Sequence, residues 1–213
     1  MKKLLFTFLI IGLGLQNNAT AQETEFEKPN WYFGAAAGAN FNFYRGTTQQ
    51  LNAGLTVPTA FHDGEGTGLY IAPLLEYHFT NSVWGIMLQT GYDNRSGEWD
   101  QVLSPCDCPM DLSTDLSYLS IEPSLRLAPF KSGFYLYAGP RFAFTMNESF
   151  SYQKSINPDY PEQVADPERN EDFDQMESSV ISMQVGAGYD IPLSSSDSRS
   201  QFVLSPFVSF QPY

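Results

Sequence analysis

The sequence predicts an all-β protein, an antiparallel up-and-down transmembrane β-barrel of the eight-stranded type with seven strands present and the closing strand missing. Three observations predict this fold. The stretch Trp31–Tyr44, WYFGAAAGANFNFY, has apolar residues at every odd position and small or polar residues at most even ones. The same two-residue alternation recurs in six later segments. Long and short connections follow one another regularly, as they do in barrels whose long loops share one end.

The first residues predict a secretory signal peptide over residues 1–21. Two lysines precede an apolar run from Leu4 to Leu15, and small residues lead to a cleavage site between Ala21 and Gln22. The run is too short to span a bilayer. We therefore expect it to be removed during secretion.

The charge and length of the mature chain restrict its class. The full sequence has 11 basic and 24 acidic residues. Removal of the signal peptide takes away two lysines and leaves 9 basic residues, so the mature chain has a formal net charge of −15. This charge makes nucleic acid a poor partner. No later apolar run is long enough for a spanning helix. We expect residues 22–30 to form a polar periplasmic lead and residues 31–213 to form the barrel domain.

The next three strands are predicted from their alternation. Leu69–Phe79 has apolar residues on one face, although its internal Pro73 removes one donor from the hydrogen-bond ladder. Val83–Asp93 follows after a turn of three residues, which predicts a hairpin. Leu116–Ala128 alternates in the same way after a long polar connection. One face of each strand would meet lipid and the other would line the lumen.

The last three predicted strands are Phe134–Met146, Ile181–Ile191 and Phe202–Phe210. The short connections of the chain fall at residues 80–82, 129–132 and 192–200, and the long ones fall at 45–67, 94–114 and 147–178. This order places the short turns in the periplasm and the long loops outside the cell. The third long loop is so acidic that it cannot belong to a core. Seven strands are one short of the even number that such a barrel needs, so we expect the closing strand and a fourth loop to be missing.

The same assignment sorts the outward aromatic residues into two belts. The periplasmic belt would contain Trp31, Phe33, Tyr77, Phe79, Trp84, Phe134 and Tyr189, and the outer belt Phe41, Phe43, Tyr92, Phe142 and Phe144. A soluble β-sandwich predicts no such sorting.

Several segments resemble a known family. The signal peptide, the first strand, and the segments GLYIAPLLEYHF, GIMLQTGYDNR and SPFVSFQPY resemble the small outer-membrane β-barrel family, in particular OmpA-like and PorT-like barrels of Bacteroidetes-type bacteria. The resemblance implies a place in the cell outer membrane of a Gram-negative cell. It also implies outer-membrane lipid, lipopolysaccharide and the barrel assembly machinery as partners. Members often continue into a peptidoglycan-binding domain, which is not in this sequence.

Four charged residues are predicted to form a structural charge network in the lumen: Glu76, Glu122, Arg126 and Arg141. Glu122 and Arg141 come out as neighbours across the hairpin that is closed by residues 129–132. An eight-stranded lumen has room for side chains and little else, so we expect paired charges to fill it. A gated solute path through a narrow pore is the alternative.

Two other patterns have a structural and a chemical interpretation. Cys106 and Cys108, in PCDCP, suit a tight loop disulfide, and the alternative is a redox or metal pair without further ligands nearby. The acidic run Asp166–Asp172 has the spacing of oxygen ligands for Ca²⁺, but Glu171 stands where an EF-hand loop needs glycine. We expect a solvated loop.

The sequence offers little for catalysis and no cofactor is expected. His62 could meet Ser104 or Asp63, and His78 lies at the periplasmic end, which is too unspecific to name a triad. We expect a non-catalytic outer-membrane barrel with a structural or envelope-integrity role. The alternative is a surface-binding module, an adhesin or a ligand receptor, that acts through its long outer loops.

Overall fold

The computed structural model describes residues 30–130, 133–194 and 200–212. The predicted signal peptide, with its cleavage site between Ala21 and Gln22, lies outside the described residues. Within them, no helix is long and apolar enough to cross a membrane.

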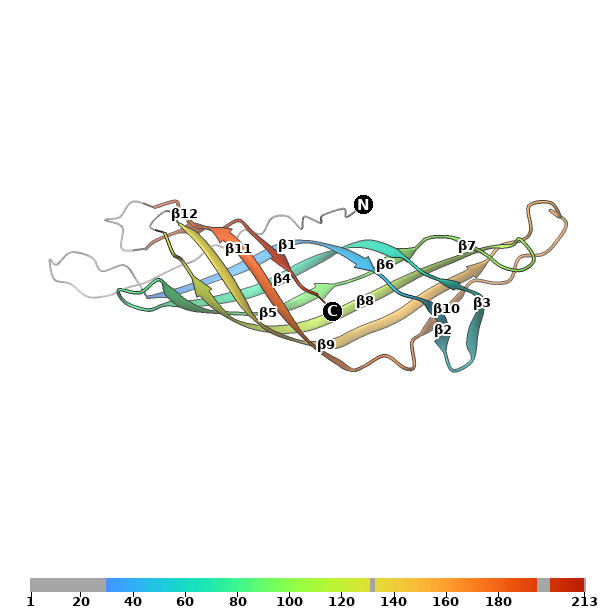
Figure 1. The fold of residues 1–213 in the computed structure, drawn as a ribbon, viewed down its shortest axis with the longest axis horizontal. Coiled ribbons are helices and arrows are strands. Elements are labelled where there is room, and N and C mark those ends of the chain that lie inside the picture. Colours follow the sequence, from blue (N-terminus) through green and yellow to red (C-terminus); the bar gives the residue numbers. More distant parts are fainter. Residues whose placement is uncertain (1–29, 131–132, 195–199, 213) are drawn as a thin grey trace.

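Seven strands follow one another in an antiparallel sheet (Figure 1). They are β1 (Trp31–Tyr44), β4 (Gly64–His78), β5 (Trp84–Asn94), β8 (Pro109–Leu127), β9 (Phe134–Lys154), β11 (Ser179–Tyr189) and β14 (Phe207–Phe210). Each strand pairs with the next in this order, and in the described part of the chain β1 and β14 stand at its two ends. The predicted all-β, up-and-down arrangement is confirmed.

The outer side of this sheet is apolar. On β1, the Phe33 side chain is 55% exposed whereas Ala36, on the other face, is fully buried. The exposed apolar side chains form a lipid band around the strands; its members include Trp31, Ile71, Ile86, Leu125, Leu136, Met183, Val185 and Val208. Such a band would be unfavourable in water, at roughly 25 cal/mol per Å² of apolar surface, and is what a lipid environment requires.

The outer edge of the lipid band is marked by one cross-strand row. Tyr92 pairs with Leu119, and Leu119 pairs with Phe144; all three are exposed apolar residues. At the opposite end, Trp31 pairs with Tyr77, and their rings lie 4.7 Å apart. These rows place Tyr92 and Phe144 of the predicted outer belt at one end, and Trp31 and Tyr77 of the predicted periplasmic belt at the other.

Strands β8 and β9 continue far beyond the lipid band. They contain 19 and 21 residues, whereas a membrane-spanning strand needs about 9–11. Ser117 pairs with Asn147 and Tyr118 with Thr145, so Met146 forms a bulge in β9. The extra residue reverses the alternation of β9 past this point.

This extension corrects two predicted bounds: β8 begins at Pro109 and not at Leu116, and β9 ends at Lys154 and not at Met146. The expectation that residues 147–178 cannot belong to a core is also wrong, because Phe150 and Tyr152 are 2% and 7% exposed. The bulge turns the even-numbered side chains Phe150 and Tyr152 inward. If the alternation of residues 134–144 had continued without the bulge, these side chains would point outward.

Short strands occupy the three predicted long loops. They are β2 (Thr48–Asn52), β3 (Leu55–Phe61), β6 (Gly97–Trp99), β7 (Val102–Leu103) and β10 (Arg169–Asp172). Strands β6 and β7 pair with β8, β10 pairs with β9, and β2 and β3 form a hairpin of their own. We call these five strands, with residues 109–117 of β8 and 147–154 of β9, the cap. Figure 1 shows it at the end of the molecule where β8 and β9 project.

The last predicted strand, Phe202–Phe210, is interrupted. It divides into β13 (Val203–Leu204), which pairs with β12 (Ile191–Pro192), and β14. Pro206 lies between them and has no amide hydrogen, although its carbonyl accepts the amide of Tyr189. The prediction of one continuous strand is therefore wrong.

Candidate functional site

The first buried charge network is centred on Arg141, whose side chain has no exposure to solvent. Its Nε donates to Oε1 of Glu122 at 3.0 Å, and its Nη2 pairs with Asp93. Asp93 also accepts from Nε of Arg95 at 2.8 Å. Tyr70 donates its hydroxyl to Oε2 of Glu122 at 3.2 Å. Two cations and two carboxylates balance, which is what charges removed from water require.

The second network is centred on Arg126, toward the other end of β8. Its Nη2 pairs with Asp190, and its Nε lies 3.5 Å from Oε2 of Glu76, an ion pair without a hydrogen bond. The guanidinium also lies 4.1 Å from the ring centre of Tyr135. Nε2 of His78 lies 3.0 Å from Oε2 of Glu76.

The four charges selected from the sequence therefore fall into two networks, Glu122 with Arg141 and Glu76 with Arg126. Sequence reasoning missed two members of the first network, Asp93 and Arg95. Asp93 lies on the inward face of β5 in the two-residue alternation, so the sequence pattern could have identified it as a lumen residue. Arg95 follows the strand in a segment predicted to be a loop, so no alternation pointed to it.

Packed apolar and aromatic side chains fill the space around these networks. Tyr135 and Tyr137 of β9 are buried together with Tyr70, Met87, Ala36, Ala72 and Phe207. Closer to the cap, Leu116, Tyr118 and Ala143 form a second cluster, against which Tyr44, Phe173, Met176 and Val180 pack. Along β8 the inward side chains thus change from charged, at Arg126 and Glu122, to apolar, at Leu116. Ion networks and packed clusters therefore occupy the described interior at successive levels.

The cap has a hydrophobic core of its own. It joins the β2–β3 hairpin to the inner side of β8 and β9, through Leu51, Val57, Phe61, Met110, Leu112, Phe150 and Tyr152. Tyr152 donates its hydroxyl to the sulfur of Met110 at 3.1 Å. Burial raises the pKa of the Tyr152 hydroxyl, and the carboxylate of Asp166 adds to the increase.

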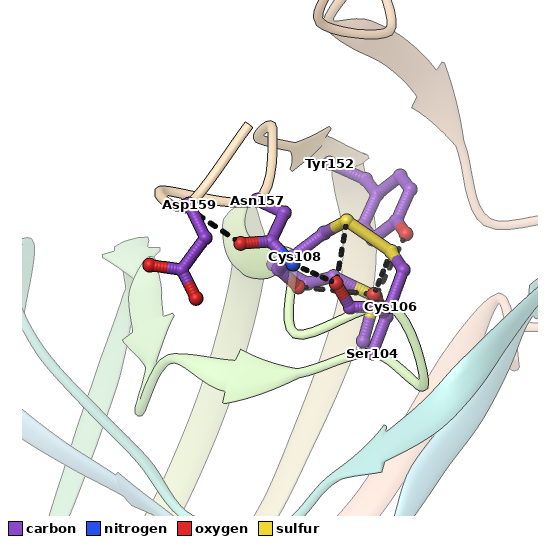
Figure 2. The surroundings of a disulfide bond; sticks show 7 residues. Ser104, Cys106, Cys108, Tyr152, Asn157 and Asp159 are labelled. Carbon is purple, nitrogen blue, oxygen red and sulfur yellow. Dashed lines mark hydrogen bonds between the residues drawn. A yellow bond between two sulfur atoms is a disulfide. The ribbon is translucent and has the colours of Figure 1, made fainter. Parts of the chain in front are cut away.

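A disulfide joins Cys106 to Cys108 in the turn after β7 (Figure 2). Ser104 donates its hydroxyl to the carbonyl of Cys108 at 3.1 Å. Asn157 donates its Nδ2 to the carbonyl of Cys106 at 2.8 Å, and its Oδ1 accepts the amide of Asp159 at 2.8 Å. The disulfide turn therefore holds the start of the acidic connection that follows β9.

The acidic run Asp166–Asp172, for which Ca²⁺ binding was the alternative to a solvated loop, does not form a ligand loop. Its second half is strand β10, in which alternate residues lie about 6.6 Å apart instead of converging on a point. Glu171 accepts Nδ2 of Asn52 at 2.5 Å, and Glu168 accepts the hydroxyl of Ser151. In the described ranges, no group of three or more His, Cys, Asp or Glu residues could hold a metal ion.

The residues considered for catalysis make contacts other than those of a triad. Nδ1 of His62 lies 3.4 Å from the hydroxyl of Thr47, and Asp63 lies 3.4 Å from Nη1 of Arg45. Ser104 is engaged by the disulfide turn, and His78 by Glu76 in the second charge network.

Comparison with known proteins agrees with the antiparallel sheet and its lipid band. A family model described as outer membrane protein beta-barrel domain matches residues 11–205, which include all strands from β1 to β13. No curated protein sequence matches the chain. The match confirms the predicted resemblance to outer-membrane barrels and places the protein in the outer membrane. The chain belongs to the outer membrane protein beta-barrel domain family.

Proposed function

We propose that the protein is a non-catalytic and non-conducting outer-membrane protein with a structural role in the cell envelope. The observation that carries this proposal is the interior, where two ion networks are embedded between layers of packed side chains. A solute path would have to separate these pairs. Leaving one member of a buried pair alone costs about 3–5 kcal/mol.

The test is single-channel recording in planar bilayers. We expect no discrete conductance steps from the intact protein, because Arg141 and its two carboxylate partners block the lumen. Arg141→Ala should introduce leak currents, and Arg45→Ala, which removes an exposed cation, should not. Stable steps from the intact protein that Arg141→Ala abolishes would instead establish a gated pore.

A second candidate function is surface recognition through the cap, as an adhesin or ligand receptor. The cap favours it because its core holds the outer connections in place, and the disulfide turn anchors the exposed segment 158–166. Deleting this segment should abolish a binding phenotype while the barrel still resists unfolding in detergent on a gel. A binding phenotype that survives the deletion would exclude this segment as the recognition element.

The remaining assignments follow from the outer-membrane location. We propose that residues 1–21 direct export and that the barrel assembly machinery inserts the chain. Outer-membrane lipid and lipopolysaccharide would surround the band. His62, Ser104 and His78 contact Thr47, the disulfide turn and Glu76 instead of one another, which supports a protein without catalytic activity. The excess of acidic residues makes nucleic acid a poor partner.

A further inference from the structure

The outer surface of the molecule changes character abruptly above the lipid band. Leu119 on β8 and Phe144 on β9 are 43% and 45% exposed. Met146, the bulge residue of β9, is 61% exposed and is the last apolar residue of this surface. The next pair of residues is Ser117, which is buried, and Asn147. The polar surface therefore begins above Met146, on the same continuous strands.

This polar surface is built from short hydrogen-bonding side chains. On β8 and β9, outward residues pair as Asp115 with Ser149, Ser113 with Ser151, and Asp111 with Gln153. Glu98 of β6 pairs with Ser113, and Asn170 and Asp172 of β10 pair with Ser151 and Ser149. We call this set the outward cap face: Glu98, Asp111, Ser113, Asp115, Asn147, Ser149, Ser151, Gln153, Asn170 and Asp172.

The outward cap face stands at the level of the lipid headgroups and above it. The stretch from Ser117 to Asp111 spans about 20 Å at roughly 3.3 Å per residue, which a strand tilt of about 40° reduces to about 15 Å of height. The headgroup layer on each side of a bilayer is only about 5–8 Å deep. The face therefore crosses that layer and reaches the zone that glycolipid sugars occupy.

The side chains of the face are held in fixed positions. Asn147 donates its Nδ2 to Oδ2 of Asp115 at 2.9 Å, and Ser96 donates its hydroxyl to Oδ1 of the same residue at 2.8 Å. Gln101 donates its Nε2 to Oδ1 of Asp111 at 2.9 Å. An ordered array of acceptors and donors loses little conformational entropy when a ligand binds.

The charge of the outward cap face decides whether it suits the phosphate groups or the neutral sugars of a glycolipid headgroup. The outward positions of β6, β8, β9 and β10 within the cap, as the structure describes them, include four carboxylates and no Lys or Arg. Arg169 of β10 is also exposed, but it pairs with Tyr152 and therefore lies on the other face of the strand. Carboxylates repel phosphate, whereas they and the neighbouring hydroxyl and amide groups can accept and donate hydrogen bonds to sugar hydroxyls.

We propose that the outward cap face docks the neutral saccharide portion of outer-leaflet glycolipids. Individual contacts are weak, but the leaflet presents the sugar at a very high local concentration, so a weak site is occupied. The cap is thereby fixed against the membrane surface. The inference rests on the outer-membrane location and holds whether the cap is structural or recognises a further ligand.

The experiment is saturation-transfer NMR on the full chain in detergent micelles. The probe is core oligosaccharide that has been released from lipopolysaccharide by mild acid, dephosphorylated and carboxyl-reduced, so that it carries no charge. The phosphorylated oligosaccharide is measured for comparison. Two variants each remove one cross-strand pair, Ser113→Val with Ser151→Val, and Asp111→Ala with Gln153→Ala. The control, Ser155→Val with Ser178→Val, repeats the first change outside the face. Resistance to heat unfolding on a gel checks the fold of every variant.

We expect saturation transfer from the intact protein to the sugar protons, and a signal reduced at least about threefold in both variants, as the loss of single hydrogen bonds predicts. The control should equal the intact protein. The proposal is overturned if the intact protein gives no transfer, if the variants match it, if the control loses as much as they do, or if only phosphorylated oligosaccharide responds. Because conductance tests the filled lumen separately, either proposal can fail without the other.

Discussion

Gly186 of β11 lies directly against the ring of its cross-strand partner Tyr137 on β9, and a Cβ atom placed on the glycine would come 2.3 Å from Cζ of that ring. Gly188 stands in the same relation to Tyr135, at 2.4 Å. The two glycines thus let both tyrosine rings lie flat over β11 in the lumen.

This packing predicts that Gly186→Ala destabilises the barrel by about 1–3 kcal/mol, the usual cost of overpacking a filled interior. Urea unfolding from lipid vesicles would measure the change. Gly54→Ala is the matched control, because its new Cβ would meet only Oδ1 of Asn52, at 3.7 Å. Equal stability of the two variants would show that Tyr137 does not occupy this position.

Arg141→Ala should cost about 3–5 kcal/mol of unfolding free energy, because Glu122 and Asp93 would be left as buried carboxylates with less compensation. Arg45→Ala removes a solvent-exposed pair with Asp63 and should change stability by less than about 1 kcal/mol. The same unfolding assay compares them. A small effect of Arg141→Ala would mean that water reaches the network.

Phe150→Ala should loosen the cap and leave the barrel intact. The side chain is buried in the cap core, so its loss should cost about 3–5 kcal/mol locally. Limited proteolysis of residues 155–168 should accelerate, while resistance of the barrel to heat unfolding on a gel stays unchanged. Loss of both together would show that cap and barrel unfold as one unit.

The raised pKa of Tyr152 predicts that the cap loses stability at alkaline pH. Burial favours the neutral form of the Tyr152 hydroxyl in the folded cap, which raises its pKa above that of the unfolded chain. Below about pH 10 the hydroxyl is neutral in both states, so it adds no pH dependence to the stability of the cap. Above about pH 10 the unfolded tyrosine ionises first, so the stability of the cap decreases as the pH rises. Proteolysis of residues 155–168 at increasing pH should show this loss. Tyr152→Phe should reduce the dependence, and an identical profile for the variant would assign it to other groups.

Removing the disulfide should free the acidic connection without affecting the barrel. With Cys106→Ser and Cys108→Ser, the turn that receives Nδ2 of Asn157 loses its constraint. Hydrogen exchange should increase in residues 157–163 and stay the same in β11. Unchanged exchange in the connection would show that hydrogen bonds alone hold the turn.

The barrel strands could be predicted because lipid on one side and a narrow lumen on the other impose a strict two-residue alternation. That alternation, together with a short turn, also brings Glu122 and Arg141 to neighbouring positions, and the structure has them in contact. The partner Arg95 lay beyond the alternating segment and could not be found in the same way.

The cap could not be predicted for two physical reasons. Its outward positions, such as Ser113 and Asp115, are as polar as those of a loop, so the apolar residues between them gave a weak signal. The bulge at Met146 then reversed the alternation, which hid Phe150 and Tyr152 from a pattern continued from Phe144. In the last predicted strand, Phe202–Phe210, the even-numbered residues are apolar without a break, but Pro206 divides the segment into two strands.

The most direct test of the account is a depth profile along the outward side of β8. Single cysteines at Leu125, Leu119, Ser113 and Asp111 would carry a spin label, and the accessibility of the label to oxygen and to a water-soluble nickel complex would be measured in lipid vesicles. We predict oxygen access at Leu125 and Leu119, and nickel access at Ser113 and Asp111, with the change between Leu119 and Ser113. Nickel access at Leu125, or oxygen-dominated access at Ser113, would contradict a lipid-embedded barrel that carries its cap outside the membrane.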